Sequence, residues 1–187
     1  MILEGLVTTR DADGQPHLAP MGPHFDPAKP DEFLLRPFPT SQSYQNLLRH
    51  PEGVLHGTDD SLLLARAAIG PVKPFPPTRP AAHITGDVLA DCCHWFEFRI
   101  VDVDTSAERI RMTAKVIHRG RGREWFGFNR AKHAVVEAAI LATRVHLLPR
   151  EQIDAEFRVF ATIIDKTGGA DEQEALRLLQ DHVRRSP

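Results

Sequence analysis

The sequence predicts a mainly β protein with α-helices, an α+β class in which a region of strands is followed by a region of helices. Three observations support this class. Residues 110–118 alternate apolar and polar side chains with the period of two of a β-strand. Residues 129–145 carry apolar side chains at helical spacing. Of the 15 prolines, 13 lie before residue 81 and none lies between 81 and 148. Since proline cannot donate to a helix or sheet ladder, the longest regular elements should follow this first part.

The first 60 residues are predicted to form short strands and one short helix. The turn signal Asp11–Gly14 separates the first two strands, which makes them a β-hairpin. Ser41 is placed to cap a helix over residues 41–48, which ends before Pro51. The strands are expected at residues 2–9, 17–21, 33–36 and 53–58.

The middle of the chain begins with a second short helix at 61–69. Residues 71–80 contain five prolines and are predicted to be an extended, stiff loop. A disordered linker is the alternative, which Val72 and Phe75 weaken because both could dock on a core. Two long strands at 94–104 and 110–118 are then joined by a turn at 105–108.

Three helices are predicted in the last third of the chain. They cover residues 129–145, residues 149–166 and a segment that begins near Asp171, and Gly168-Gly169 ends the second of them. Asp171 and Glu174 suggest a capping pair for the third. We therefore expect a strand-rich domain over 1–120 and a helical domain over 121–187.

Composition excludes several function classes. The chain has 187 residues, 42% hydrophobic residues and a formal net charge of -2, which argues against a protein that mainly binds nucleic acid. No apolar run approaches the length of a membrane span, and the N-terminus reads as a strand rather than a signal peptide. The two cysteines, Cys92 and Cys93, are adjacent, so a disulfide between them would be strained. These features predict a cytoplasmic protein that neither spans a membrane nor contacts one.

A polar cluster between Arg36 and Asn46 is the best candidate site. A guanidinium at a strand end, followed by the hydroxyls of Ser41 and Ser43 and the amide of Asn46, suits an anion such as a phosphate monoester. The N–H groups of the new helix would point the same way. The alternative is that Ser41 only caps the helix and Arg36 is a solvated edge residue.

Other candidates are weaker. No His or Cys pair has the spacing of a metal site, so no metal is predicted. Cys92 and Cys93 could be reactive, but buried cysteines commonly act as small apolar residues. Thr58 either donates to a ligand at a strand end or belongs, with Asp59 and Asp60, to a helix N-cap.

Five segments together carry a resemblance to a known family: Ile2–Thr9, the hairpin Asp13–Gly22, Arg36–Leu47, Thr58–Asp60 and residues 129–144. They resemble an uncharacterised, archaeal-type flavoprotein family, a domain of unknown function within the FMN-binding split-barrel superfamily. The resemblance implies a six-stranded FMN-binding split β-barrel followed by a C-terminal helical domain, and a homodimer with FMN near the subunit interface.

The resemblance assigns residues position by position. It gives Arg36, Ser41, Ser43 and Asn46 to the phosphate and ribityl chain of FMN, in agreement with the anion site. Flavin-lining positions are Thr8, Thr9, Met21, Gly22 and Thr58. His56 stands where the family pattern has asparagine, which puts an amide contact there in doubt. No catalytic residue is assigned.

Three functions follow from these observations. The first is an FMN-binding oxidoreductase that acts on an unidentified small molecule, with the chemistry supplied by the flavin. The second is a non-catalytic flavin carrier or sensor, which the absence of an evident acid/base pair supports. The third is a cofactor-free dimeric interaction module, which requires that no flavin binds.

Overall fold

The computed structural model describes residues 1–106 and 109–186. These residues form two compact units. The barrel unit comprises Met1–Thr58 and Lys73–Glu124, and the helical unit comprises Asp59–Val72 and the chain from Trp125 onward. Residues 107 and 108, which belong to the predicted turn at 105–108, lie outside the described residues.

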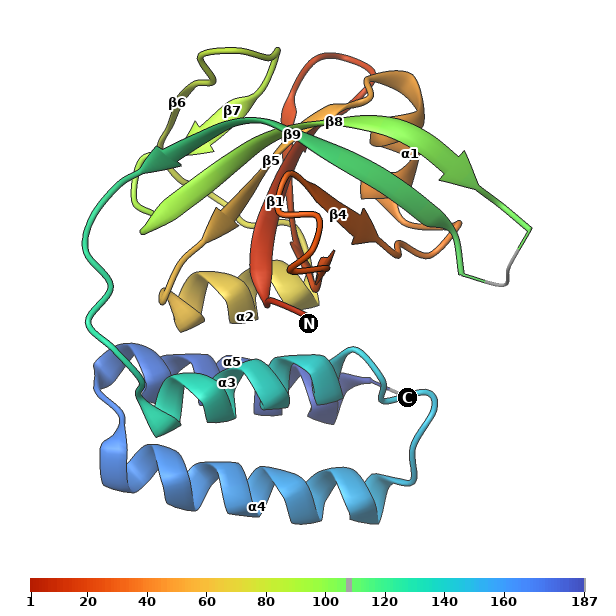
Figure 1. Cartoon of the computed structure of the whole chain (residues 1–187). Helices are drawn as coiled ribbons and strands as arrows, with labels where there is room; N and C mark the ends of the chain where they lie inside the picture. The colour runs from red at the N-terminus through yellow and green to blue at the C-terminus, as the bar shows by residue number, and fades with distance from the viewer. Residues whose placement is uncertain (107–108, 187) are drawn as a thin grey trace. The chain divides into compact units, whose positions relative to one another are not determined.

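The barrel unit is built on one curled antiparallel sheet of seven strands in the order β2-β1-β5-β8-β9-β4-β3. Figure 1 shows the long strands β8 and β9 crossing the whole width of this sheet. The mixed α+β class, with a split-barrel type of sheet followed by helices, is confirmed. The strands are β1 (Gly5–Arg10), β2 (Pro16–Met21), β3 (His24–Phe25), β4 (Glu32–Leu35), β5 (Glu52–Gly57), β8 (His94–Asp104) and β9 (Arg111–Arg121).

The predicted hairpin is present, with Gly5 opposite Met21 and Arg10 opposite Pro16. Helix α1 (Gln42–Arg49) is also present, and Ser41 caps it by accepting a hydrogen bond from the Tyr44 amide. Alternating side chains of the strands enclose an apolar core, which α1 joins through Tyr44 and Leu47. The strand members of this core include Val7, Phe33, Leu35, Leu55, Phe98, Ile100 and Met112.

The proline-rich segment is not a loop throughout. Its last residues form β6 (Thr78–Pro80), which pairs with β7 (Asp87–Leu89) in a separate two-stranded sheet. The prediction of an extended loop over 71–80 is therefore wrong for these three residues. A pair of only three residues is stable here because Arg10 on β1 holds Asp87 through two hydrogen bonds of 2.9 and 3.0 Å.

The helical unit contains four helices. Helices α3 and α5 each contact both α2 and α4, so α3 and α5 form a layer between the other two (Figure 1). Alanine fills the buried face of α3 at positions 131, 134, 138 and 142, which allows neighbouring helices to approach closely. The helices are α2 (Ser61–Ile69), α3 (Arg130–Ala142), α4 (Arg150–Thr167) and α5 (Ala170–Arg185).

One buried carboxylate explains why α2 belongs to this unit. Glu172 on α5 is 6% exposed, accepts hydrogen bonds from the Ser61 hydroxyl and the Gly169 amide, and pairs with Lys132 of α3 at 3.1 Å. It thereby joins α2, α3 and α5. The predicted capping pair of Asp171 and Glu174 is wrong, because Glu172 caps α5.

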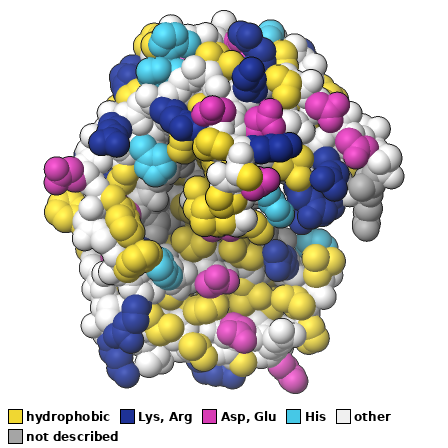
Figure 2. Space-filling view, viewed as in Figure 1, with side chains coloured by type: hydrophobic (Ala, Val, Ile, Leu, Met, Phe, Trp, Pro, Cys, Tyr) yellow, Lys and Arg dark blue, Asp and Glu magenta, His cyan; other side chains and the backbone are white. Residues whose placement is uncertain are grey.

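Among residues 1–106 and 109–186, no helix has the length and apolarity needed to cross a membrane. Basic and acidic side chains are interspersed on the face that Figure 2 shows.

Candidate functional site

The site is organised around the corner where β4 ends and α1 begins, which we call the β4–α1 corner (Arg36, Ser41 and Ser43). Leu35 at the end of β4 and Tyr44 on α1 belong to the same core cluster, so the two ends are anchored together. Arg36 directly follows β4 and is exposed. Within the described residues, its guanidinium has no ion-pair partner.

Ser43 is the unusual residue of this corner. Its side chain is buried, with 2% exposure, yet its hydroxyl has no hydrogen-bond partner among the described residues. The backbone N–H groups of Gln42 and Ser43, at the start of α1, are likewise unpartnered in that part of the chain. Among the described residues, no fully buried side-chain polar atom lacks a partner, so the Ser43 hydroxyl is reached by solvent. Together with the two N–H groups it presents donors that a ligand could satisfy.

The surroundings of this corner are electropositive. Burial, followed by the positive charges of Arg36, the Met1 α-amino group, Arg109 and Arg111, lowers the pKa of His24 on the neighbouring strand β3. Arg109 also lies over the Phe38 ring at 4.3 Å. An anion at the β4–α1 corner would therefore be stabilised by several cations.

Asn46 connects α1 to the sheet. It is fully buried. Its side-chain Nδ2 donates to the Thr9 hydroxyl at 3.0 Å, and its Oδ1 accepts from the side-chain Nε2 of Gln42 at 2.7 Å. Thr9 accepts through its oxygen and keeps its O–H available for donation. The structure thus brings Asn46 and Thr9 together with the corner, with Asn46 as a residue that positions Thr9.

Thr8 lies on the opposite face of β1 from Thr9, because neighbouring residues of a strand alternate. Its hydroxyl donates to the Asp87 carbonyl of β7 at 2.5 Å. Both residues are buried, with exposures of 1% and 3%. The structure therefore does not place Thr8 on the same face as Thr9.

The remaining predicted flavin-lining residues gather at the other end of β1. Met21 pairs with Gly5, Gly22 follows it, and Thr58 follows the end of β5. Thr9 lies four steps along β1 from Gly5, which is roughly 13 Å at 3.3 Å per residue. An elongated ligand could contact both groups of residues, whereas a phosphate group alone could not.

Both ring nitrogens of His56 are hydrogen-bonded to backbone groups inside the barrel unit. It is fully buried, its Nδ1 lies 3.1 Å from the Leu6 carbonyl and its Nε2 accepts from the Leu89 amide at 3.0 Å. This pattern requires the neutral ring with the proton on Nδ1. Burial lowers the pKa of His56 to about 4. We call this arrangement of His56 between Leu6 and Leu89 the His56 joint.

Sequence reasoning missed a buried glutamate that holds the turn between β6 and β7. Glu97 on β8 is fully buried and accepts hydrogen bonds from the Ala82 and His83 amides at 3.0 and 2.7 Å, and from the Trp95 indole. Burial alone would raise its pKa, but these hydrogen bonds lower it. The signal in the sequence was a lone acidic residue between aromatic residues in His94–Phe98.

The cysteines are poorly suited to chemistry. Cys92 and Cys93 are both buried and, in the described part of the chain, form no disulfide. Burial raises the pKa of the Cys92 thiol to about 11, which keeps it protonated and unreactive near neutral pH. Within the same described residues, no group of three His, Cys, Asp or Glu side chains is arranged to hold a metal ion.

The fold of the barrel unit is shared with solved structures of split-barrel type. Over 64% of this chain and 64% of that one, 2-nitrobenzoate 2-nitroreductase of Pseudomonas fluorescens superposes with a TM-score of 0.56 at 13% identity. Flavoredoxin of Desulfovibrio vulgaris superposes with the same TM-score at 10% identity, over 65% of this chain and 70% of that chain. At these identities the likeness shows the fold.

The chain belongs to the DUF447 family. Residues 3–123 match the description "Protein of unknown function (DUF447) N-terminal domain", and residues 129–181 match "Protein of unknown function (DUF447)". An FMN-bound DUF447 protein from Methanosarcina mazei is similar over 97% of this chain and 94% of that one, with a TM-score of 0.83 and 22% identity. No curated protein sequence matches the chain significantly.

Proposed function

We propose that this protein binds FMN, with the phosphate at the β4–α1 corner. The observation that carries the proposal is the Ser43 hydroxyl, which has no partner among the described residues and is reached by solvent although the residue is 2% exposed. It lies next to two unpartnered N–H groups at the start of α1 and close in sequence to the unpaired Arg36. The FMN-bound relative from Methanosarcina mazei supports the choice of ligand.

The chemistry of the donors fits the phosphate. Arg36 supplies a planar charged donor, and Ser43 and the α1 N–H groups supply neutral donors directed at an anion. Ser41 accepts from the Tyr44 amide, which leaves its own O–H able to donate. Thr9 lies on the α1 side of β1 and suits the ribityl chain, while Met21, Gly22 and Thr58 lie where the far end of the ligand would reach.

We further propose that the protein is an oxidoreductase for a small molecule. When bound, FMN supplies hydride or electron transfer, and the residues of this chain bind and orient it. Two structural neighbours, the nitroreductase and the flavin reductase of the styrene monooxygenase system from Pseudomonas putida, support this class. The second candidate is a flavin carrier, which is favoured because the proposed site residues comprise a guanidinium, hydroxyls, an amide, a thioether and a glycine, with no general acid or base.

Titration of the purified protein with FMN tests the cofactor. We expect a yellow complex, and we expect Arg36→Ala to weaken FMN binding about tenfold or more, since hydrogen bonds to charged groups contribute roughly 1.5–3 kcal/mol. Arg49→Ala is the matched control, because Arg49 is an exposed cation in the last turn of the same helix. No FMN binding at micromolar cofactor, or equal effects of the two variants, would contradict the proposal.

Turnover separates the oxidoreductase from the carrier. The FMN-loaded protein is mixed anaerobically with NADH or NADPH and then with an electron acceptor, and the flavin absorbance is followed. Repeated reduction and reoxidation support the enzyme. Flavin that stays bound and oxidised with both nucleotides, across a panel of acceptors, supports the carrier.

We also propose a homodimer and a cytoplasmic location. Exposed aromatic residues support the dimer: Trp125, Phe126 and Phe128 are 50%, 94% and 86% exposed, and apolar surface of this kind often marks an interface. Light scattering after size exclusion should give twice the 20.9 kDa mass. A monomer mass across the micromolar range would contradict the dimer.

A further inference from the structure

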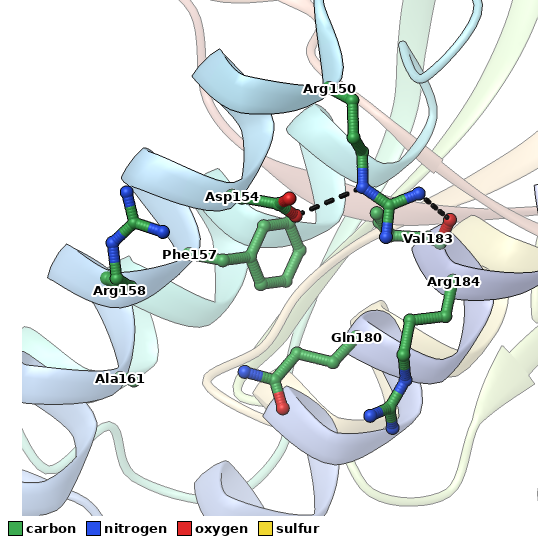
Figure 3. A pocket seen from close by; sticks show the side chains of 8 residues that line it. All are labelled: Arg150, Asp154, Phe157, Arg158, Ala161, Gln180, Val183 and Arg184. Atoms are coloured by element: carbon green, nitrogen blue, oxygen red, sulfur yellow. Dashed lines mark hydrogen bonds and ion pairs between the residues drawn. The ribbon is translucent and has the colours of Figure 1, made fainter.

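The helical unit contains a pocket that the proposed FMN site does not use. This α4–α5 pocket lies between those two helices and has a volume of about 360 Å³. Figure 3 shows the Phe157 ring at its centre, with arginine side chains from both helices around it. Phe157, Ala161 and Val183 provide the apolar part of its lining.

Three arginines surround this apolar lining, and their partners differ. Arg150 is held in place, since its Nε donates to Asp154 at 3.1 Å and its Nη1 to the Val183 carbonyl at 3.1 Å. Arg184 pairs with Asp181. Arg158 has no acidic partner among the described residues, although it lines the same pocket.

The net charge of the pocket limits the charge that its ligand can carry. Three arginines and the two aspartates that pair with them leave one net positive charge, which belongs to Arg158. A group with a single negative charge would be neutralised there, while a dianion would also be repelled by Asp154 and Asp181. A carboxylate has the required charge, and its two oxygens match the planar fork of a guanidinium.

The remaining lining indicates what the carboxylate is attached to. Phe157 is 5% and Val183 3% exposed, so both are fixed by packing and only a small part of each forms the pocket floor. A compact flat apolar group could contact this rigid floor at small entropic cost. Gln180 also lines the pocket, and its side-chain amide has no hydrogen-bond partner in the described part of the chain. It offers one more donor or acceptor.

We propose that the α4–α5 pocket binds a small monocarboxylate with an aromatic or similarly flat apolar body. Arg158 supplies the unpaired charge, Arg150 a preoriented donor, and Phe157 the surface for the apolar body. The site lies entirely within the helical unit, so it would carry an effector or a second substrate rather than the cofactor. It does not depend on FMN binding.

Calorimetric titration of the full chain with phenylacetate tests this site. The protein is saturated with FMN where FMN binds, so that the barrel unit does not compete for the probe. We expect phenylacetate to bind, while phenylacetamide, its neutral analogue, and inorganic phosphate bind at least about tenfold more weakly. Equal binding of phenylacetate and phenylacetamide, binding of phosphate alone, or no binding at all would overturn the proposal.

Two variants locate the binding. Arg158→Gln removes an exposed charge and should weaken phenylacetate binding about tenfold, whereas Arg177→Gln, an exposed arginine of α5 outside the pocket lining, should leave it unchanged. Ala161→Leu fills the apolar part without changing charge and should also weaken binding. Equal effects of the two arginine variants, or full binding by Ala161→Leu, would place the probe elsewhere.

Discussion

The β4–α1 corner and the His56 joint both lie in the barrel unit, but their polar groups differ in hydrogen bonding. At the His56 joint, both ring nitrogens have partners, and nearby Thr8 and Glu97 are also hydrogen-bonded. At the corner, the Ser43 hydroxyl and two N–H groups have no partner among the described residues. Satisfied polar groups hold a fold together, while unsatisfied ones at an electropositive corner indicate a ligand.

The largest expected effect concerns Glu97, because it satisfies two backbone N–H groups and an indole at once. Glu97→Ala should lower the free energy of unfolding by about 4 kcal/mol, since three charge-assisted hydrogen bonds are lost together. Urea denaturation measures it. Glu52→Ala is the control, because Glu52 is less buried and should cost less. A loss below about 1 kcal/mol for Glu97→Ala would mean that the hydrogen bonds of Glu97 do not hold the turn between β6 and β7.

The His56 joint predicts a dependence of stability on pH. The pKa of His56 in the folded chain is about 4, below the ordinary value of 6.5, so the unfolded state binds more protons between these values. The contribution of neutral His56 to the free energy of unfolding is therefore complete above about pH 6.5 and is lost as the pH falls through about 4. The difference in pKa corresponds to roughly 3 kcal/mol.

Urea denaturation of the FMN-free protein from pH 4 to pH 7 checks this dependence. His56→Gln removes the titrating ring, so the variant should lose less stability than the original chain across the same range. Parallel curves for the two proteins would show that other groups cause the change and that His56 is not held neutral.

The smallest expected effects give the sharpest contrast between the two regions. Ser43→Ala should change the free energy of unfolding by less than about 0.5 kcal/mol, because no protein hydrogen bond is lost, but should weaken FMN binding about tenfold. Thr8→Val should do the opposite, with a loss of about 1 kcal/mol in stability and unchanged FMN affinity. If Thr8→Val weakens FMN binding as much as Ser43→Ala does, the distinction between polar groups that hold the fold and polar groups that bind the ligand is wrong.

Local signals predicted much of the fold. The alternation at 110–118 identified β9, Ser41 identified the start of α1, and Gly168 ended α4 as expected. Each of these features depends on residues close together in the sequence, so a short window is enough to predict it.

Features held by distant partners were not predictable in this way. Strand β6 was missed because prolines hide its alternation and because Glu97, 14 residues beyond His83, holds the turn that follows β6. The partner of Asn46 is Thr9, 37 residues away. The sequence therefore indicated an anion site at Arg36–Asn46, but it could not distinguish Ser43, which lacks a partner among the described residues, from Asn46, which has two.

The insertion of α2 between β5 and β6 has a consequence for synthesis of the chain. Residues 59–72 leave the ribosome long before Arg130–Ala142 and Ala170–Arg185, the helices against which α2 packs. About 100 further residues must be synthesised before the apolar residues of α2, such as Leu64, can pack against these helices. At 5–20 residues per second this takes several seconds. The nascent barrel unit thus carries an unpaired apolar helix, so a chaperone that binds such a segment should matter most while the second half of the chain is still being translated.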